Sequence, residues 1–267
     1  MSDLLVIFAR EPIAGRVKTR LAAGIGANAA TEVYRKLLEH TIETARSTGI
    51  HAVVFLADVP GEAWASTLGA CKGLMVDGFR VAAKFPLRRI LGAVLRVRAG
   101  NPTKRAFTAS ERRRQSIPYR LLDHSFEIQV KGDLGRRMGE CFSRSFADGA
   151  SRVVLVGSDN AHFRKDHIRG AFDALDDHRV VLGPADDGGY WLVGQRMPGI
   201  DFFRGIPWSD PATLETTRER LRELHVAWSE LETLPDIDTA EDLRRAIDDL
   251  RVDEGLRRQL QTIAGTL

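Results

Sequence analysis

The stretch LLVIFA at residues 4–9, followed directly by REPIAGRVKTR at residues 10–20, decides the fold class. A continuous apolar run of this kind predicts a strand that is buried on both faces, as in a parallel sheet. Residues 27–47 then place apolar side chains on one helical face, and AVVFLA at residues 52–57 predicts a second buried strand. Strand, helix and strand predict a parallel βαβ unit with a right-handed crossover.

The same alternation of strands and helices returns in the second half of the chain. Asp133 is suited to cap a helix that starts at Leu134, and Thr239 with Asp242 resembles a capping box for a late helix. Further elements are predicted as strands at 152–157 and 179–183, a helix at about 165–175, and a short apolar run at 191–193. We therefore expect an α/β fold: a single-domain, three-layer, Rossmann-like arrangement with a mostly parallel sheet.

The domain organisation follows from where this alternation fails. Residues 1–250 are expected to form one domain, and residues 251–267 a C-terminal helical tail. A basic insertion is expected at about 78–125, since Arg80 to His124 contains twelve Lys or Arg residues and two acids. It could contact a membrane surface, an anionic acceptor or a partner, or could simply be solvated. Because the net excess of basic charge lies in this segment, the pI of about 9.0 is weak evidence for nucleic acid, which is not an expected partner.

Composition sets the broad class. Hydrophobic residues make up 43% and charged residues 28%, as in an ordinary soluble globular protein. Cys71 and Cys141 form no CxxC pair, and no Cys/His spacing indicates zinc. With no signal-peptide pattern and no apolar run long enough for a membrane span, we expect a cytoplasmic protein.

The loop at residues 10–20 carries the first chemical signal. Arg10, Arg16, Lys18 and Arg20 are packed into eleven residues with Gly15, which lets the backbone approach a ligand closely. Cations and backbone N–H groups near a helix start suit a di- or triphosphate, and the alternative is a solvated basic loop. The spacing is not that of a Walker loop.

Acidic residues follow three other segments. Asp159 ends the predicted strand at 152–157 and could bind Mg²⁺ or Mn²⁺, or could cap the next helix. Asp236 and Asp238 would share one face of a strand, as a metal-binding pair should, unless one of them caps the last helix. In the sequence DDGGY at residues 186–190, at most one acid is expected to point into a site, and Asp-Gly alternatively indicates a hairpin turn.

Four segments together resemble a known family: FAREPIAGRVKTRL at 8–21, GDLGRRM at 132–138, GPADDGGY at 183–190 and DIDT at 236–239. They resemble the bacterial GT-A-like glycosyltransferases, described as nucleotide-diphospho-sugar transferases. This family is similar to the 2-phospho-lactate guanylyltransferases and, more distantly, to the molybdenum cofactor guanylyltransferases. The resemblance covers residues 4–60 and 127–245.

The resemblance implies a nucleotide-diphospho-sugar transferase fold and a set of site residues. Arg10, Gly15, Lys18 and Arg20 would bind the nucleotide phosphates, and Asp159 and Asp238 would bind Mg²⁺ or Mn²⁺. Lys18 would also act in catalysis, by stabilising charge on the departing nucleoside diphosphate, and Asp187 is the best candidate for the acceptor base. The donor or acceptor pocket would be lined by Asp133, Asp187, Gly188, Gly189 and Tyr190.

Two departures from the relatives' pattern stand out. Relatives continue Gly-Ser-Asp with a small residue and Pro, whereas here Asn160-Ala-His162 follows, which puts the shape of this loop in question. His162 could be a local ligand, although a surface histidine is the simpler expectation. The second departure is the basic insertion.

Three functions fit these residues. The first is a metal-dependent transferase that uses a nucleotide-diphospho-sugar donor and a small-molecule acceptor. The second is a nucleotidyltransferase that joins an NTP to a phosphorylated acceptor and releases pyrophosphate. The third is a nucleotide-binding protein without catalytic activity.

Overall fold

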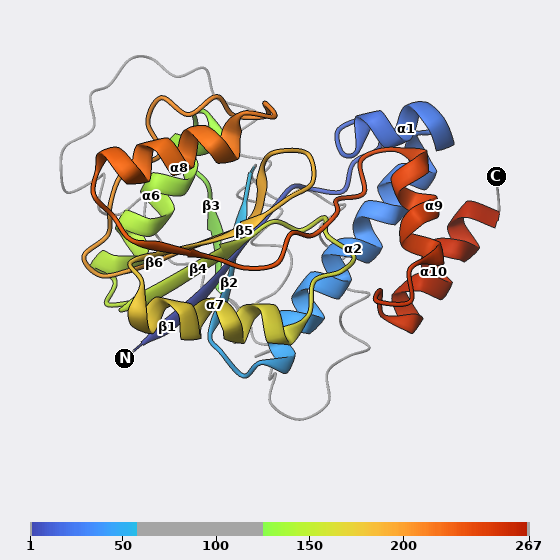
Figure 1. Cartoon of the computed structure of the whole chain (residues 1–267). Coiled ribbons are helices and arrows are strands. Elements are labelled where there is room, and N and C mark those ends of the chain that lie inside the picture. The colour runs from blue at the N-terminus through green and yellow to red at the C-terminus, as the bar shows by residue number, and fades with distance from the viewer. Residues whose placement is uncertain (1, 58–124, 266–267) are drawn as a thin grey trace, which may run out of the picture.

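The computed structural model of the chain describes residues 2–57 and 125–265, and these residues form a seven-stranded sheet. The strands lie in the order β3-β2-β1-β4-β6-β5-β7, and β6 alone runs antiparallel to its neighbours (Figure 1). Their bounds are β1 Asp3–Ala9, β2 Ala52–Leu56, β3 Ser125–Ile128, β4 Arg152–Val156, β5 Val180–Pro184, β6 Tyr190–Arg196 and β7 Trp228–Glu230. The predicted mostly parallel sheet is confirmed.

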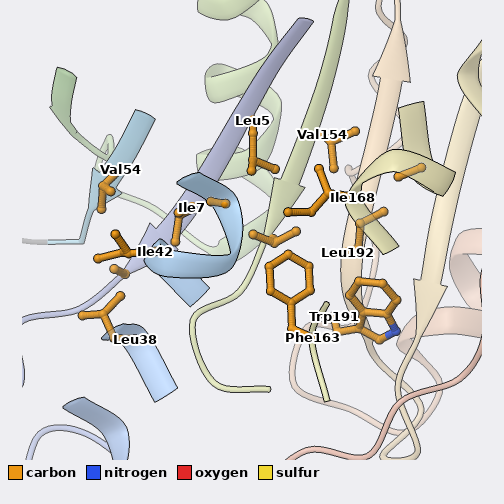
Figure 2. Close-up of a cluster of buried hydrophobic side chains, with 14 of the residues drawn as sticks. Leu5, Ile7, Leu38, Ile42, Val54, Val154, Phe163, Ile168, Trp191 and Leu192 are labelled. Carbon is orange, nitrogen blue, oxygen red and sulfur yellow. The ribbon is translucent and has the colours of Figure 1, made fainter. Parts of the chain in front are cut away.

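Helices cover both faces of this sheet (Figure 1). The helices α2 (Ala27–Ser47) and α7 (Lys165–Asp177) bury one face of β1, β2 and β4, in the cluster that Figure 2 shows around Leu5, Ile7 and Ile168. The helices α6 (Leu134–Ala147) and α8 (Thr213–Glu223) bury the other face, where alternate strand residues such as Val6 and Leu155 point. The three-layer α/β fold is therefore confirmed.

A third apolar cluster lies beside the sheet. There α1 (Thr19–Ile25) and α2 pack against α9 (Ala240–Asp248) and α10 (Glu254–Gly265), through residues that include Leu21, Leu37, Leu243 and Leu260. The helix α10 falls within the predicted tail at 251–267, and the division of the chain at residue 250 stays a prediction. Almost all of the insertion predicted at 78–125 lies outside the described residues.

The parallel strands bring four loops to one edge of the sheet. The strands β1, β4 and β5 all end at this edge, and the segments that follow them are residues 10–20, 157–163 and 185–189. A parallel bridge between Ala185 and Leu234 brings in a fourth segment, which leads to Asp236 and Asp238. Ligands bind at this edge in open α/β sheets. Within the described ranges, no helix combines the length and apolar character needed to cross a membrane.

Candidate functional site

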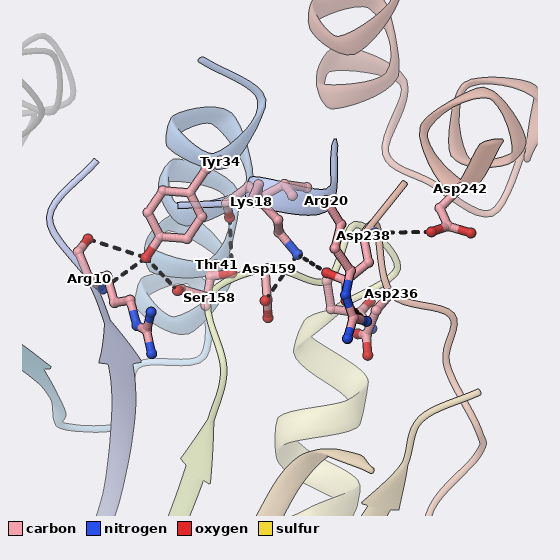
Figure 3. Close-up of polar contacts among 12 residues, drawn as sticks. Arg10, Lys18, Arg20, Tyr34, Thr41, Ser158, Asp159, Asp236, Asp238 and Asp242 are labelled. Carbon is pink, nitrogen blue, oxygen red and sulfur yellow. Dashed lines mark hydrogen bonds and ion pairs between the residues drawn. The ribbon is translucent and has the colours of Figure 1, made fainter. Parts of the chain in front are cut away.

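Lys18 lies at the centre of the site, between two carboxylates (Figure 3). Its Nζ is 3.1 Å from Oδ2 of Asp159 and 3.0 Å from Oδ1 of Asp238. The Lys18 side chain is only 4% exposed, whereas those of Asp159 and Asp238 are 46% and 38% exposed. The carboxylates therefore keep a face toward solvent while the ammonium group lies beneath them.

The backbone that places this ammonium group is unusual. Lys18 precedes α1 with a φ of 46°, in the left-handed region that a residue with a side chain rarely adopts. Gly15, three residues earlier, has a φ of 79°, which glycine adopts at little cost. Strained backbone positions cluster at functional sites because the surrounding contacts must hold them in place. The conformation of residues 15–18 agrees with a loop shaped for binding.

The charges of the cluster are coupled. Burial alone would lower the pKa of Lys18, but the neighbouring Asp159 and Asp238 more than offset this and raise its pKa, so the amine stays protonated. Burial, with the charge of Asp159 adding to it, raises the pKa of Asp236 to about 8. Within the Asp-x-Asp pair, Asp238 is the residue that contacts the Lys18 ammonium group. Arg20 is exposed and places Nη1 3.7 Å from Oδ2 of Asp238.

Tyr34 of α2 joins the first two segments of the site, which follow β1 and β4. Its hydroxyl accepts a hydrogen bond from the Arg10 N–H at 2.8 Å and lies 3.0 Å from Oγ of the buried Ser158. The sequence places Tyr34 simply on the apolar face of a helix. The signal that it carries is chemical: a tyrosine on a buried face needs a partner for its hydroxyl. Its contacts fix the loops after β1 and β4 relative to each other.

Asn160 joins the loop after β4 to the segment that carries the Asp-x-Asp pair. Its Nδ2 donates to the carbonyl of Pro235 at 3.1 Å and to Oδ1 of Asp236 at 3.2 Å. Its Oδ1 accepts the N–H of His162 at 2.8 Å. Asn160, which departs from the relatives' pattern, therefore stabilises the loop after β4 and positions the neighbouring segment at Pro235 and Asp236.

His162 is buried, so the expectation of a surface histidine is wrong. It is 3% exposed, and its Nε2 lies 3.0 Å from Oδ2 of Asp249, which follows α9. The burial arises because α9 and α10 cover the loop after β4, an arrangement that local sequence does not reveal. The contact makes His162 a tether for the C-terminal helices.

The stability of the protein is expected to fall as the pH falls below about 6.5. Burial lowers the pKa of His162 below its ordinary value. The unfolded chain therefore takes up a proton first, and the stability present above the ordinary pKa is lost as the pH decreases through it. Urea unfolding measures how much the free energy of unfolding decreases between pH 7.5 and pH 5.5. In His162→Gln this decrease should be smaller than in the unaltered protein by up to about 1 kcal/mol. An identical decrease in both proteins would contradict this role for His162.

The sequence DDGGY forms the turn between β5 and β6, so the hairpin interpretation is correct. The Ala185 N–H donates to the Gly189 carbonyl at 3.0 Å, and Oδ1 of Asp187 accepts the N–H of Gly189 at 2.9 Å. Gly188 has a φ of 86°. Asp187 is exposed, and its charge contributes to the raised pKa of Asp236. The turn therefore stands beside the Asp-x-Asp segment.

Two residues predicted for the donor or acceptor pocket have structural contacts. Asp133 caps α6 by accepting the N–H of Arg136 at 2.7 Å, as its sequence context predicts. The hydroxyl of Tyr190 is buried and near Thr217 of α8, and burial raises the pKa of Tyr190. Its ring packs edge-on against Trp208. Their place in a ligand pocket stays a prediction.

The predicted phosphate loop divides between two places. Lys18 and Arg20 face the carboxylates, whereas Arg10 and Arg16 line a cavity of about 400 Å³ with Arg137. In Figure 3, Arg10 lies on the other side of the Tyr34 hydroxyl from Lys18. The cations of the loop therefore lie in two neighbouring places, and their binding of phosphate stays a prediction.

The carboxylates of Asp159 and Asp238 fit a divalent cation. Both lie about 3 Å from a common positive charge, the Lys18 ammonium group, and both are oxygen donors with an exposed face. Among the residues described, no three His, Cys, Asp or Glu side chains gather closely enough to hold a metal ion. Mg²⁺ in nucleotide sites is typically held by one or two carboxylates together with substrate phosphates. A two-carboxylate site is therefore compatible with a metal–nucleotide complex.

Comparisons with known proteins find one matching family and several similar solved structures. The family described as "Uncharacterized protein conserved in bacteria (DUF2064)" matches residues 96–210. A "putative nucleotide-diphospho-sugar transferase" from Desulfovibrio desulfuricans G20 is 25% identical, with a TM-score of 0.69 over 100% of this chain and 98% of its own. No curated protein sequence matches the chain.

Two more distant structures are also similar, and the first of them shares the fold. The inositol-1-phosphate CTP transferase from T. maritima is 9% identical, covers 98% of this chain and 96% of its own, and has a TM-score of 0.50. A Mycobacterium tuberculosis H37Rv protein in complex with manganese is 15% identical, covers 93% and 99%, and has a TM-score of 0.43. The resemblance carried by the four sequence motifs is confirmed, and the chain has the nucleotide-diphospho-sugar transferase fold.

Proposed function

We propose that the chain is a metal-dependent transferase that uses a nucleotide-diphospho-sugar as its donor. The observation that carries this proposal is the buried Lys18 ammonium group, held about 3 Å from both Asp159 and Asp238 at the ligand-binding edge of the sheet. Support comes from the similar Desulfovibrio desulfuricans protein, which is 25% identical over almost its whole length. The prediction of a transferase agrees with the fold of the similar structures.

The charges of the site suit the departure of a nucleoside diphosphate. In the proposed reaction, the acceptor attacks the anomeric carbon of the sugar, and the bond from that carbon to the diphosphate oxygen breaks. Lys18 is a fixed positive charge for the oxygen that becomes negative, and the exposed Arg20 places a second positive charge beside Asp238. Asp159 and Asp238 would hold Mg²⁺ or Mn²⁺, which would neutralise the diphosphate.

The proton of the acceptor needs a base. Asp187 is the proposed one, since it is exposed at the turn between β5 and β6, beside the Asp-x-Asp segment. One oxygen of its carboxylate accepts the N–H of Gly189, which holds the side chain in a defined orientation. The other oxygen is left to accept a proton.

A nucleotidyltransferase is the second candidate. The cavity lined by Arg10, Arg16 and Arg137 favours it, because three guanidinium groups next to the Lys18 cluster suit a second phosphorylated group. In that reaction, the phosphate of the acceptor attacks the α-phosphorus of an NTP, and the bond to the leaving pyrophosphate breaks.

The two reactions release different products, and this separates them. We expect UDP- or GDP-sugars to be consumed with release of the nucleoside diphosphate and no pyrophosphate, and only with Mg²⁺ or Mn²⁺ present. Release of pyrophosphate from one of the four NTPs, with a panel of phosphorylated acceptors, would instead identify a nucleotidyltransferase. Nucleotide binding without turnover of any donor would leave the protein as a nucleotide-binding protein without catalytic activity. A thermal-shift screen of nucleotides with and without Mn²⁺ selects the donors to test.

A further inference from the structure

The helices α1 and α9 lie side by side and approach each other closely at Gly24 and Ala240 (Figure 1). A Cβ built on Gly24 would lie 2.9 Å from Cβ of Ala240. Carbon atoms in contact are about 3.5–4.0 Å apart, so a methyl group at position 24 would push the two helices apart by roughly 0.6–1 Å. The absence of a side chain at Gly24 therefore sets how closely α1 can pack against α9.

The backbone of Gly24 does not itself require glycine. This residue lies in the last turn of α1 with helical backbone, whereas Gly15 and Gly26 on either side of the helix have φ values of 79° and 83°. Alanine is the better helix former at such a position. The approach of Ala240 is therefore the feature of the structure that explains a glycine here.

Each of these two helices fixes one partner of the contact between Lys18 and Asp238. The carbonyl of Lys18 accepts the N–H of Ala22 at 2.8 Å, which is a hydrogen bond of the first turn of α1. The backbone N–H of Asp238 donates to Oδ2 of Asp242, in the first turn of α9, at 3.1 Å. The backbone of Lys18 therefore moves with α1, and that of Asp238 moves with α9.

The contact between Lys18 and Asp238 is sensitive to a displacement of this size. Its Nζ–Oδ1 distance is 3.0 Å. An added separation of roughly 0.6–1 Å would lengthen it beyond the range of a hydrogen bond, which ends near 3.2 Å. The contact of Lys18 with Asp159 does not involve α9, because Asp159 follows β4. The packing of α1 against α9 thus controls the distance to Asp238 in particular.

We propose that Gly24 is a positioning residue of the site: its close approach to Ala240 holds α1 against α9 at the separation that places the Lys18 ammonium group on Asp238. The placement of Lys18 is a property of the folded chain. The proposal rests on the proposed function only for the consequence that this placement has for nucleotide binding.

Acetylation of Lys18, followed by mass spectrometry of its peptide, tests this placement without any ligand. The Lys18 side chain is 4% exposed, so it should react slowly compared with the exposed Lys165. We expect Gly24→Ala to accelerate acetylation of Lys18 relative to Lys165 by about 10- to 100-fold, the value of one charge-assisted hydrogen bond. Adding Ala240→Gly to this variant moves the methyl group from α9 to α1, and the double variant should recover the slow rate.

Gly170→Ala is the matched control, because Gly170 also lies within a helix, α7, and has room for a methyl group. A Cβ built on it would meet only Cδ2 of Leu231, at 4.0 Å, so this variant should leave the Lys18 rate unchanged. Urea titration of each variant establishes that the folded protein is being acetylated. A merely structural role for Gly24 would lower the free energy of unfolding and leave the Lys18 rate of the folded protein unchanged. An unchanged rate in Gly24→Ala would overturn the proposal, as would a fast rate that the double variant does not reverse.

Binding of the Mn²⁺–nucleotide complex separates this inference from the proposed function. We expect Gly24→Ala to weaken this binding by about 10-fold or more and the double variant to restore it. Unchanged affinity in Gly24→Ala would overturn the role of this placement in nucleotide binding. The proposed donor function fails separately, if no nucleotide or nucleotide sugar binds to the unaltered protein in the presence of metal while the acetylation rates change as expected.

Discussion

Asp159→Ala is expected to abolish the Mg²⁺- or Mn²⁺-dependent part of nucleotide binding, with a loss of at least about 100-fold in affinity. Asp159 is one of two carboxylates that converge on a single positive charge. Its removal leaves a divalent cation with Asp238 alone, and it leaves the buried Lys18 with one carboxylate where it had two. Calorimetry with Mn²⁺ and with EDTA measures the two contributions separately. Unchanged affinity and unchanged metal dependence would refute the metal assignment.

Two other variants show whether such a loss is specific to the site. Asp177→Ala removes an exposed carboxylate at the end of α7 and should leave nucleotide binding unchanged. Lys18→Met removes the ammonium group that lies between the carboxylates, so it should weaken nucleotide binding without weakening the binding of Mn²⁺ alone. If Lys18→Met also lost Mn²⁺ binding, the variant would have changed the conformation of the loop and not only removed the positive charge.

The sheet was predictable from the sequence because its strands are buried on both faces. β1, β2, β4 and β5 read as continuous apolar runs that end in loop residues, and their predicted bounds agree with the structure to within one or two residues. The elements missing from the prediction lack this signal. The helix α8 has the sequence TLETTRERLRE, in which Leu214 and Leu221 are the buried apolar residues, and β7 is three residues long. The burial of Leu214 and Leu221 and the pairing of β7 with β5 both depend on neighbours that are distant in sequence.

The site was predictable as a set of residues but not as a geometry. Loop positions after parallel strands predict that Lys18 and Asp159 lie at one edge of the sheet, and the family resemblance adds Asp238 to them. The sequence separations of Lys18 from Asp159 and Asp238 are 141 and 220 residues. The position of the ammonium group between the carboxylates depends on how α1 packs against α9, which periodicity does not encode. The separation of Arg10 from Lys18 likewise depends on the hydroxyl of Tyr34. The contacts of buried polar groups, such as those of Asn160 and His162, join residues that are distant in sequence. Local sequence therefore does not predict them.

Gly188→Ala is expected to destabilise the protein by about 2–4 kcal/mol. Gly188 has a φ of 86°, and a Cβ built on it would lie 2.1 Å from the carbonyl oxygen of Pro211. That oxygen belongs to the backbone just before α8, and the Leu214 N–H of α8 donates to the Gly188 carbonyl at 2.8 Å. An alanine would strain the turn and push it away from α8. The free energy of unfolding from urea titration measures the effect.

Gly189→Ala is the matched control, because the two glycines are adjacent and differ in their surroundings. A Cβ on Gly189 would meet Oδ1 of Asp187 at 3.1 Å, and this side chain can rotate away, so a loss below about 1 kcal/mol is expected. Equal losses in the two variants would contradict the assigned contact with Pro211. If the difference is observed, packing against the segment before α8 explains why position 188 requires glycine. The prediction of a donor or acceptor pocket at this turn then rests on Asp187 and Gly189.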